Sequence, residues 1–455
     1  MAREPGGGMI ARLGIAQTLA WGSTYYLPAM LATPMAHDLG VSTPTIFAAF
    51  SAALIVSALL GPSAGRMIDR AGGRPVLAAT SIVFAIGLAG LGLTHGATGL
   101  FAAWLVLGIG MGAGLYEAAF ATLVAVYGNR SRNAITGVTL IAGFASTVGW
   151  PLSTFMESHI GWRGACFAWA ALHLTLGLAL NLSLPRGMAA GAAATAPGNA
   201  GASAPPAPRE TPAQRLASMS LAFVFAATWF TSTAMAAHLP RVLQAGGATL
   251  ATAVMVGALI GPAQVAARLL EFGLLRKVHP LLSARIAAAL HPVGALAFGV
   301  IGAPAAALFG VLHGAGNGIL TIAKGTLPLV IFGPGGYGYR QGVLMVPARV
   351  AQALAPWLFG MCLDTFGVNA LWLTSGLGVA AIAMLMAIRQ VEVPAADAVP
   401  LSSAHARRHR PGRPGSVDGK PLDQPAAQGI GEEAVAAEDR HQQPPEHARR
   451  RHQSQ

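Results

Sequence analysis

The chain has 455 residues, of which 54% are hydrophobic and only 10% are charged, and its mean hydropathy is +0.55. Soluble globular domains carry about 25% charged residues, so this composition excludes an ordinary soluble protein and favours a protein of the lipid bilayer. The formal charge is +12, and much of it comes from Arg and Lys in short loops between apolar stretches. Basic residues in such loops set the orientation of a membrane protein, so the charge does not indicate nucleic-acid binding. Cys166 and Cys362 both lie in apolar stretches, so neither a disulfide framework nor a thiolate metal site is expected.

Twelve apolar stretches, each long enough to cross a membrane as a helix, follow one another along the chain. The first six lie near residues 9–32, 44–65, 76–95, 98–127, 134–156 and 161–184. The second six lie near residues 215–238, 248–272, 281–302, 304–327, 341–363 and 367–388. The predicted fold is an all-α polytopic membrane protein, with twelve transmembrane helices in two six-helix halves at 1–184 and 215–388.

Two polar segments lie outside these halves. Residues 185–214 are rich in Pro, Ala and Gly without periodicity, which predicts a flexible linker, and residues 389–455 mix basic and acidic residues with Pro and Gln, which predicts a disordered tail. Arg and Lys gather on the side of the linker, whereas the opposite side has Arg163 and Arg241. Because cytoplasmic loops retain basic residues, both termini, the linker and the tail are expected in the cytoplasm.

A weak internal repeat supports the two halves. At an offset of 200, residues 51–62 (SAALIVSALLGP) match residues 251–262 (ATAVMVGALIGP) at six positions, which include the final Gly-Pro pair. Identity among Ala, Val and Leu is common in apolar helices, so the Gly-Pro pair carries most of the weight. Duplicated halves are typical of secondary transporters, in which the substrate site lies between the repeats.

A short charged motif joins the second and third spans. Gly65, Asp69, Arg70, Gly72 and Arg74 have the spacing Gly-x-x-x-Asp-Arg-x-Gly-x-Arg. This motif resembles the signature loop of the major facilitator superfamily of secondary transporters, and it lies between the spans that the family requires. The resemblance covers residues 9–388 and implies a gating role, in which the acid meets the cytoplasmic end of the eleventh helix when the transporter faces outward.

Few ionisable residues lie inside predicted spans, and five of them bear on function. Each costs about 2.5–3.5 kcal/mol at the bilayer centre on insertion scales, so each calls for a function or a partner. They are Glu117, Arg268, Glu271, Lys324 and Arg349. Arg268 and Glu271 are three residues apart and so share a helix face, which allows an internal ion pair. Arg349 has no acid at helical spacing, which leaves a bound anion or an acid on another span as its partner.

The family resemblance extends to the charges. In the oxalate and monocarboxylate transporters of the superfamily, cationic residues on spans eight and eleven bind the substrate carboxylate, and Arg268 and Arg349 are similarly placed. Glu117 and Glu271 are candidates for proton or charge coupling, although Glu117 could equally neutralise an Arg or line water. The polar side chains expected to contribute cavity contacts are Tyr25, Tyr26, Tyr116 and Asn317.

The sequence therefore predicts a bacterial inner-membrane transporter, not an enzyme, that moves a small organic anion such as a carboxylate by alternating access. A drug or metabolite efflux pump of the same superfamily is the main alternative, and a solute-sensing receptor is another. The expected partners are a small-molecule substrate, a coupling proton or counter-anion, and the bilayer. A monomer without cofactor, metal or nucleic acid is expected.

Overall fold

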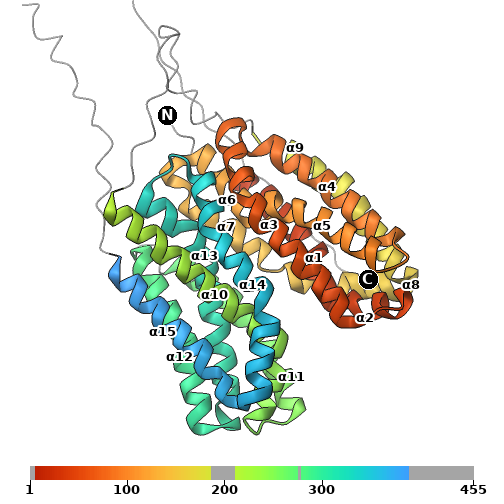
Figure 1. Ribbon diagram of the computed structural model, residues 1–455. Helices are drawn as coiled ribbons and strands as arrows, with labels where there is room; N and C mark the ends of the chain where they lie inside the picture. The colour runs from red at the N-terminus through yellow and green to blue at the C-terminus, as the bar shows by residue number, and fades with distance from the viewer. Residues whose placement is uncertain (1–5, 186–210, 275–277, 389–455) are drawn as a thin grey trace, which may run out of the picture. The chain divides into compact units, whose positions relative to one another are not determined.

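The computed structural model describes residues 6–185, 211–274 and 278–388, and all regular elements in these ranges are helices (Figure 1). The predicted tail at 389–455 and most of the predicted linker at 185–214 lie outside the described residues. Within the linker, residues 212–214 already belong to a helix, so the second half begins three residues earlier than predicted.

Nine α-helices make up the described part of the first half. They are α1 (Gly7–Ser23), α2 (Leu27–Leu39), α3 (Thr43–Ala71), α4 (Gly73–Leu93), α5 (Ala97–Gly114), α6 (Tyr116–Tyr127), α7 (Arg132–Ala142), α8 (Ala145–Leu172) and α9 (Leu178–Leu182). The predicted first span is broken at residues 24–26, and the fourth is broken at Leu115. Spans five and six meet inside α8 at Gly161, whose φ of +69° reverses the chain at little steric cost.

Six α-helices make up the described part of the second half. They are α10 (Pro212–Ala245), α11 (Leu250–Gly273), α12 (Pro280–Ile301), α13 (Ala306–Phe332), α14 (Tyr337–Phe366) and α15 (Leu371–Ala387). A capping box begins α10, where Thr211 and Gln214 exchange hydrogen bonds, and it fixes the start of this half.

Within the described ranges, eight continuous helical stretches are long and apolar enough to cross a membrane. Two of them, Ala97–Leu182 and Tyr337–Ala387, contain 86 and 51 residues, whereas one crossing needs about 20 residues. These two stretches contain the turns that separate predicted spans, and α1 with α2 supplies a further, interrupted span. The helices are consistent with the twelve predicted spans.

Glycines set the spacing of the helices within each half. On α5, Gly108 and Gly112 face the backbone of α3, while Gly110 and Gly114 face Phe84 and Thr80 of α4. In the second half, Gly310, Gly314 and Gly318 of α13 face α11 in the same way. These glycines therefore serve close helix packing, and both halves use them in this way.

The two halves meet mainly through α3 and α14, which run past one another. We call the end of the bundle where α3 ends and α14 begins the Asp69 end. There Gly61 and Gly65 of α3 lie against Gly342 and Gly338 of α14, so that a Cβ on Gly342 would be 2.5 Å from the Gly61 carbonyl oxygen. Small residues four apart on both helices allow this approach of backbones from different halves.

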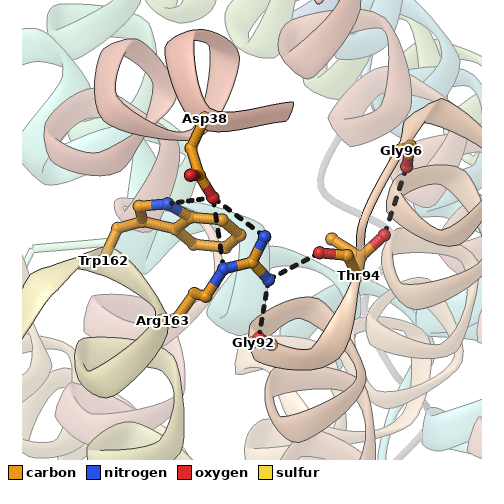
Figure 2. A network of polar contacts seen from close by, with 6 residues as sticks. All are labelled: Asp38, Gly92, Thr94, Gly96, Trp162 and Arg163. Atoms are coloured by element: carbon orange, nitrogen blue, oxygen red, sulfur yellow. Dashed lines mark hydrogen bonds and ion pairs between the residues drawn. The ribbon is translucent and has the colours of Figure 1, made fainter. Parts of the chain in front are cut away.

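At the opposite end, the described ion pairs tie helices of the same half. Figure 2 shows Arg163 of α8 paired with Asp38 of α2 at 2.8 Å, while its guanidinium also donates to the carbonyls of Gly92 and Thr94. Trp162 donates to the same carboxylate. In the second half, Arg241 of α10 pairs with Asp364 of α14. Both arginines that the sequence placed on this side therefore have acid partners.

We expect Gly108→Val to lower the free energy of unfolding by about 1–3 kcal/mol, because its Cβ would lie 2.6 Å from the Ala53 carbonyl oxygen on a neighbouring helix. Thermal unfolding of the purified protein in detergent measures this loss. Gly257→Val is the matched control, since no atom lies within 4 Å of a Cβ there. Equal shifts for both variants would contradict the packing role of Gly108.

Candidate functional site

An ion pair at the centre of the bundle joins the two halves. Arg349 of α14 donates from Nη2 to Glu117 Oε2 of α6 at 2.9 Å, and from Nη1 to Gln352 Oε1 at 3.1 Å. The Arg349 side chain is only 3% exposed and that of Glu117 is 16% exposed. The partner of Arg349 is therefore an acid on another span. The sequence had left two partners open, such an acid or a bound anion.

Two tryptophans from different halves stack beside this ion pair. Trp21 of α1 and Trp229 of α10 have ring centroids 6.1 Å apart and planes within 6° of parallel. The guanidinium carbon of Arg349 lies 5.9 Å from the Trp21 ring and 5.5 Å from the Trp229 ring. Aromatic faces attract cations, so the pair stabilises positive charge at this position.

Lys324 of α13 brings a second positive charge to the same aromatic surface. Its Nζ lies 3.9 Å from the centroid of the Trp229 ring, and its residue is only 4% exposed. No hydrogen-bond partner of this ammonium is present among the described residues, although it has three donors. A buried ammonium whose donors are unpaired is costly, and an anion that reached it would remove much of that cost.

The predicted cavity tyrosines surround Trp21. Tyr25 and Tyr26 lie in the break between α1 and α2, with ring centroids 5.2 and 6.3 Å from that of Trp21. Tyr116 begins α6 at 4.9 Å from Trp21, directly before Glu117. Tyr25 also reaches Thr233 of the second half at 3.5 Å. The structure thus brings these three residues together with Glu117 and Arg349.

Asn317 lies elsewhere. It belongs to a pocket of about 40 Å³ formed by α10, α12, α13 and α15, together with His291 and His313. A second cavity of about 10 Å³ adjoins the central ion pair and is lined by Glu117, Arg349 and residues of α3, α5 and α14. The six predicted substrate contacts are therefore divided among separate places.

Arg268 and Glu271 of α11 lie against α7 and are 5% and 4% exposed. Arg268 donates from Nη1 to the Thr139 carbonyl at 3.3 Å, and Glu271 pairs with Arg132 at 3.4 Å. The ion pair between Arg268 and Glu271 that their spacing allowed is not what the structure shows, because both side chains reach across to the first half. These contacts hold α7 and α11 together, and Arg268 is also close enough to Tyr26, Tyr116 and Lys324 to interact with them electrostatically.

The motif around Asp69 also joins the halves. The Asp69 carboxylate accepts hydrogen bonds from the backbone N–H groups of Gly338 and Tyr339, at 2.9 and 2.8 Å, in the first turn of α14. A carboxylate is favourable there because the first N–H groups of a helix lack partners and carry partial positive charge. Arg66 lies over the Tyr339 ring at 5.0 Å and adds to the contact.

The motif is more helical than the predicted loop. Gly65, Asp69 and Arg70 belong to the last turns of α3, and Arg74 belongs to the first turn of α4. Only Gly72 separates the two helices, with a φ of +79° that favours glycine. Its helical position fixes the direction of the Asp69 side chain, which a flexible loop would not.

Several residues at these sites were not predicted as site residues. Lys324 was recognised only as an ionisable residue within a span, and Trp21, Trp229 and Arg132 were not singled out. A signal existed for the tryptophans, since each lies in the first helix of its half. In the described part of the chain, no group of three or more His, Cys, Asp or Glu residues could hold a metal ion.

Comparisons with known proteins agree with this architecture. The sequence is 28% identical over 384 residues to an uncharacterized 38 kDa protein in the 23S RNA operon of Thermoproteus tenax, which covers 83% of this chain and 94% of the relative. The fold is similar to that of the human organic anion transporter MFSD10 (TETRAN), with a TM-score of 0.58 and 18% identity, over 83% of this chain and 98% of that one.

The fold is also similar to that of the proton:xylose symporter XylE of the major facilitator superfamily, which was solved with 6-bromo-6-deoxy-D-glucose. The TM-score is 0.64 and the sequence identity is 14%. That match covers 84% of this chain and 95% of the symporter. At such identities the two likenesses concern the fold alone. The sequence profile of the Major Facilitator Superfamily matches residues 13–323, more than half of the chain. The protein therefore belongs to the Major Facilitator Superfamily.

Proposed function

We propose that this transporter carries a small organic anion, such as a carboxylate, across a bacterial inner membrane by alternating access. The observation that carries the proposal is the unpaired, buried ammonium of Lys324 beside the Glu117–Arg349 ion pair. When Lys324 is protonated, Glu117 offsets one of the two positive charges of Arg349 and Lys324, so these three groups keep a surplus of one. A monocarboxylate would offset that surplus and accept hydrogen bonds from the ammonium.

The aromatic surroundings define the second requirement for the cargo. Trp21 and Trp229 offer apolar ring faces beside Arg349, and the Trp229 ring also lies beside Lys324. A compact carboxylate with an apolar part fits such a site better than a polyhydroxylated sugar does. Hydrophobic cations, the cargo of many efflux pumps, would meet uncompensated positive charge there, and this disfavours the efflux alternative.

Alternating access requires contacts between the halves that form in one state and break in another. Asp69 with the first turn of α14, and Arg132 with Glu271, are such contacts, and both belong to the Asp69 end. We place this end, both termini and the linker in the cytoplasm, in accord with the basic residues near it. In this arrangement the described state is closed toward the cytoplasm, and the protein acts as a monomer with a coupling proton or counter-anion.

We expect Lys324→Gln to reduce carboxylate binding by about 10- to 100-fold, because a charge-assisted hydrogen bond contributes about 1.5–3 kcal/mol. The same change removes a buried unpaired charge, so thermal stability should rise or stay unchanged. Counterflow of radiolabelled acetate, lactate and oxalate in proteoliposomes, with thermal unfolding, measures both effects. Arg285→Gln is the control, since this Arg of α12 donates to the Leu385 carbonyl away from the site.

Normal counterflow by Lys324→Gln would exclude the ammonium as the anion ligand. Binding of hydrophobic cations by the wild type, with no carboxylate exchanged, would favour the efflux pump instead.

Arg349→Gln should abolish counterflow and also lower stability by about 3–5 kcal/mol, because it leaves the buried Glu117 carboxylate without its partner. The double variant Glu117→Gln with Arg349→Gln should recover most of the stability and none of the transport. Thermal unfolding and counterflow on the single and double variants separate the two roles. Recovery of transport in the double variant would show that Arg349 serves only to neutralise Glu117.

Asp69→Asn should weaken the closed Asp69 end by about 0.5–2 kcal/mol, because it deletes the charge that faces the N-terminus of α14. A cysteine placed at Ser57, which lines the small cavity beside Glu117 and Arg349, should then react faster with a hydrophilic maleimide in a background without Cys166 and Cys362. Asp364→Asn is the control, because that Asp pairs within one half. An unchanged labelling rate would leave Asp69 as a topology signal only.

A further inference from the structure

Two histidines of the second half contact one another in a place that the proposed anion site does not use. His291 of α12 and His313 of α13 are 7% and 4% exposed, and their Nδ1 atoms are 3.0 Å apart. On its other side, His291 Nε2 lies 2.9 Å from the hydroxyl of Thr374 on α15. Three helices are thereby linked through one row of hydrogen bonds.

The hydrogen bonds fix which nitrogen carries each proton when both rings are neutral. The Thr374 hydroxyl donates its hydrogen to the Leu371 carbonyl at 3.0 Å, so it must accept from His291 Nε2. A neutral imidazole has one N–H, and His291 Nδ1 is therefore an acceptor that receives the Nδ1–H of His313. The row then ends at His313 Nε2, an unprotonated nitrogen for which no hydrogen bond is described.

This nitrogen belongs to a residue that lines the pocket of about 40 Å³, which has room for about two waters. Thr228, Thr231 and Ser232 of α10 and Asn317 of α13 supply the polar groups of its wall. Of the described lining residues, only His291 and His313 are titratable. A proton arriving through water in this pocket would be taken up at His313 Nε2, and the imidazolium formed would still donate to His291.

Other titratable or charged groups occur on the helices packed against α13, but none of them lines the pocket. They include Glu117 of α6, Arg132 of α7, His238 and Arg241 of α10, Arg268 and Glu271 of α11, Arg285 of α12 and Arg349 of α14. The acids among them already face arginines, in the pairs Glu117–Arg349 and Glu271–Arg132. The histidine pair is thus a separate base.

The position of the pair on α13 connects it to the anion site. His313, Asn317, Thr321 and Lys324 follow one another at intervals of four, four and three residues, which places them on one face of the helix. At a rise of about 1.5 Å per residue, His313 lies about 16 Å along the axis from Lys324. One polar stripe therefore joins the pocket to the unpaired ammonium.

We propose that the His291–His313 pair is the proton-binding site of this transporter, and that a proton held at His313 Nε2 moves together with the anion bound at Lys324. The proton enters from pocket water, forms the Nε2–H bond and leaves to water when the site faces the other side. The coupling to an anion rests on the proposed function, whereas proton binding by the pair does not.

Proton binding is tested first without any substrate. In ¹⁵N spectra of the full-length protein labelled at histidine, the resonances lost in His313→Asn should convert from neutral imidazole to imidazolium between pH 8 and pH 5. Asn is chosen because its amide N–H can still donate to His291 Nδ1 and preserve the fold. Resonances that stay neutral throughout this range would overturn the proposal, whatever the cargo is.

Coupling is tested with the monocarboxylate that the wild type exchanges fastest in proteoliposomes. A gradient of about two pH units supports at most about 100-fold accumulation of a monoanion carried with one proton, since each tenfold ratio is about 1.4 kcal/mol. His313→Asn should lose this accumulation while keeping counterflow. Thr374→Val, which keeps both rings but removes the acceptor for His291, should shift the pH at which accumulation falls to half.

His238→Asn is the control, because its ring contacts the Pro356 carbonyl outside the pocket. Full accumulation by His313→Asn would refute the coupling role. A wild type that exchanges no carboxylate, but whose pair takes up a proton, would refute the proposed anion cargo and leave the proton site in place.

Discussion

The ion pair between Arg349 and Glu117 is the contact on which the arrangement of the centre depends. It is buried, it joins α14 to α6, and so it fixes the distance between the two halves where the cargo must bind. Breaking it would expose two charges to an apolar interior, which costs several kcal/mol. The tryptophans, the tyrosines and Lys324 are arranged around this pair, and the charge balance of the whole site follows from it.

Contacts between the halves differ in kind along the bundle. At the Asp69 end they are backbone approaches between glycines, a carboxylate on a helix N-terminus, and the pair of Arg132 with Glu271. Each can separate without leaving a cavity in a half, because the halves pack internally through their own glycine faces. Alternating access requires rigid halves and an interface between them that can open.

The sequence predicted the fold well and the site only in part. The spans follow from the length of apolar runs, and the close packing of α5 follows from its alternating glycines, because both are local properties. The breaks at residues 24–26 and at Leu115 were missed, although Pro28 lies in the first turn of α2 and Gly114 ends α5 directly before Leu115. The partner of Arg349 lies 232 residues away, and no spacing rule reaches that far.

The family resemblance predicted a contact between distant parts of the chain, which local sequence patterns could not. The spacing around Asp69 carried over the expectation that its carboxylate meets the eleventh helix, and α14 is the helix that it meets. The role of Arg268 as a substrate ligand stays a prediction, because its guanidinium donates to the Thr139 carbonyl and also interacts electrostatically with Tyr26, Tyr116 and Lys324.

The uncompensated charge of Lys324 also bears on how the membrane potential acts on the cycle. A charge that crosses the full membrane field gains or loses about 2.3 kcal/mol per 100 mV. An empty site would carry one positive charge, a site holding a monoanion would carry none, and a site holding a monoanion and a proton would again carry one. If the anion moves alone, only the returning empty carrier is charged, so the membrane potential would act on that step. If the anion and a proton move together, the loaded and the empty carrier have the same charge, so one full cycle would move no net charge.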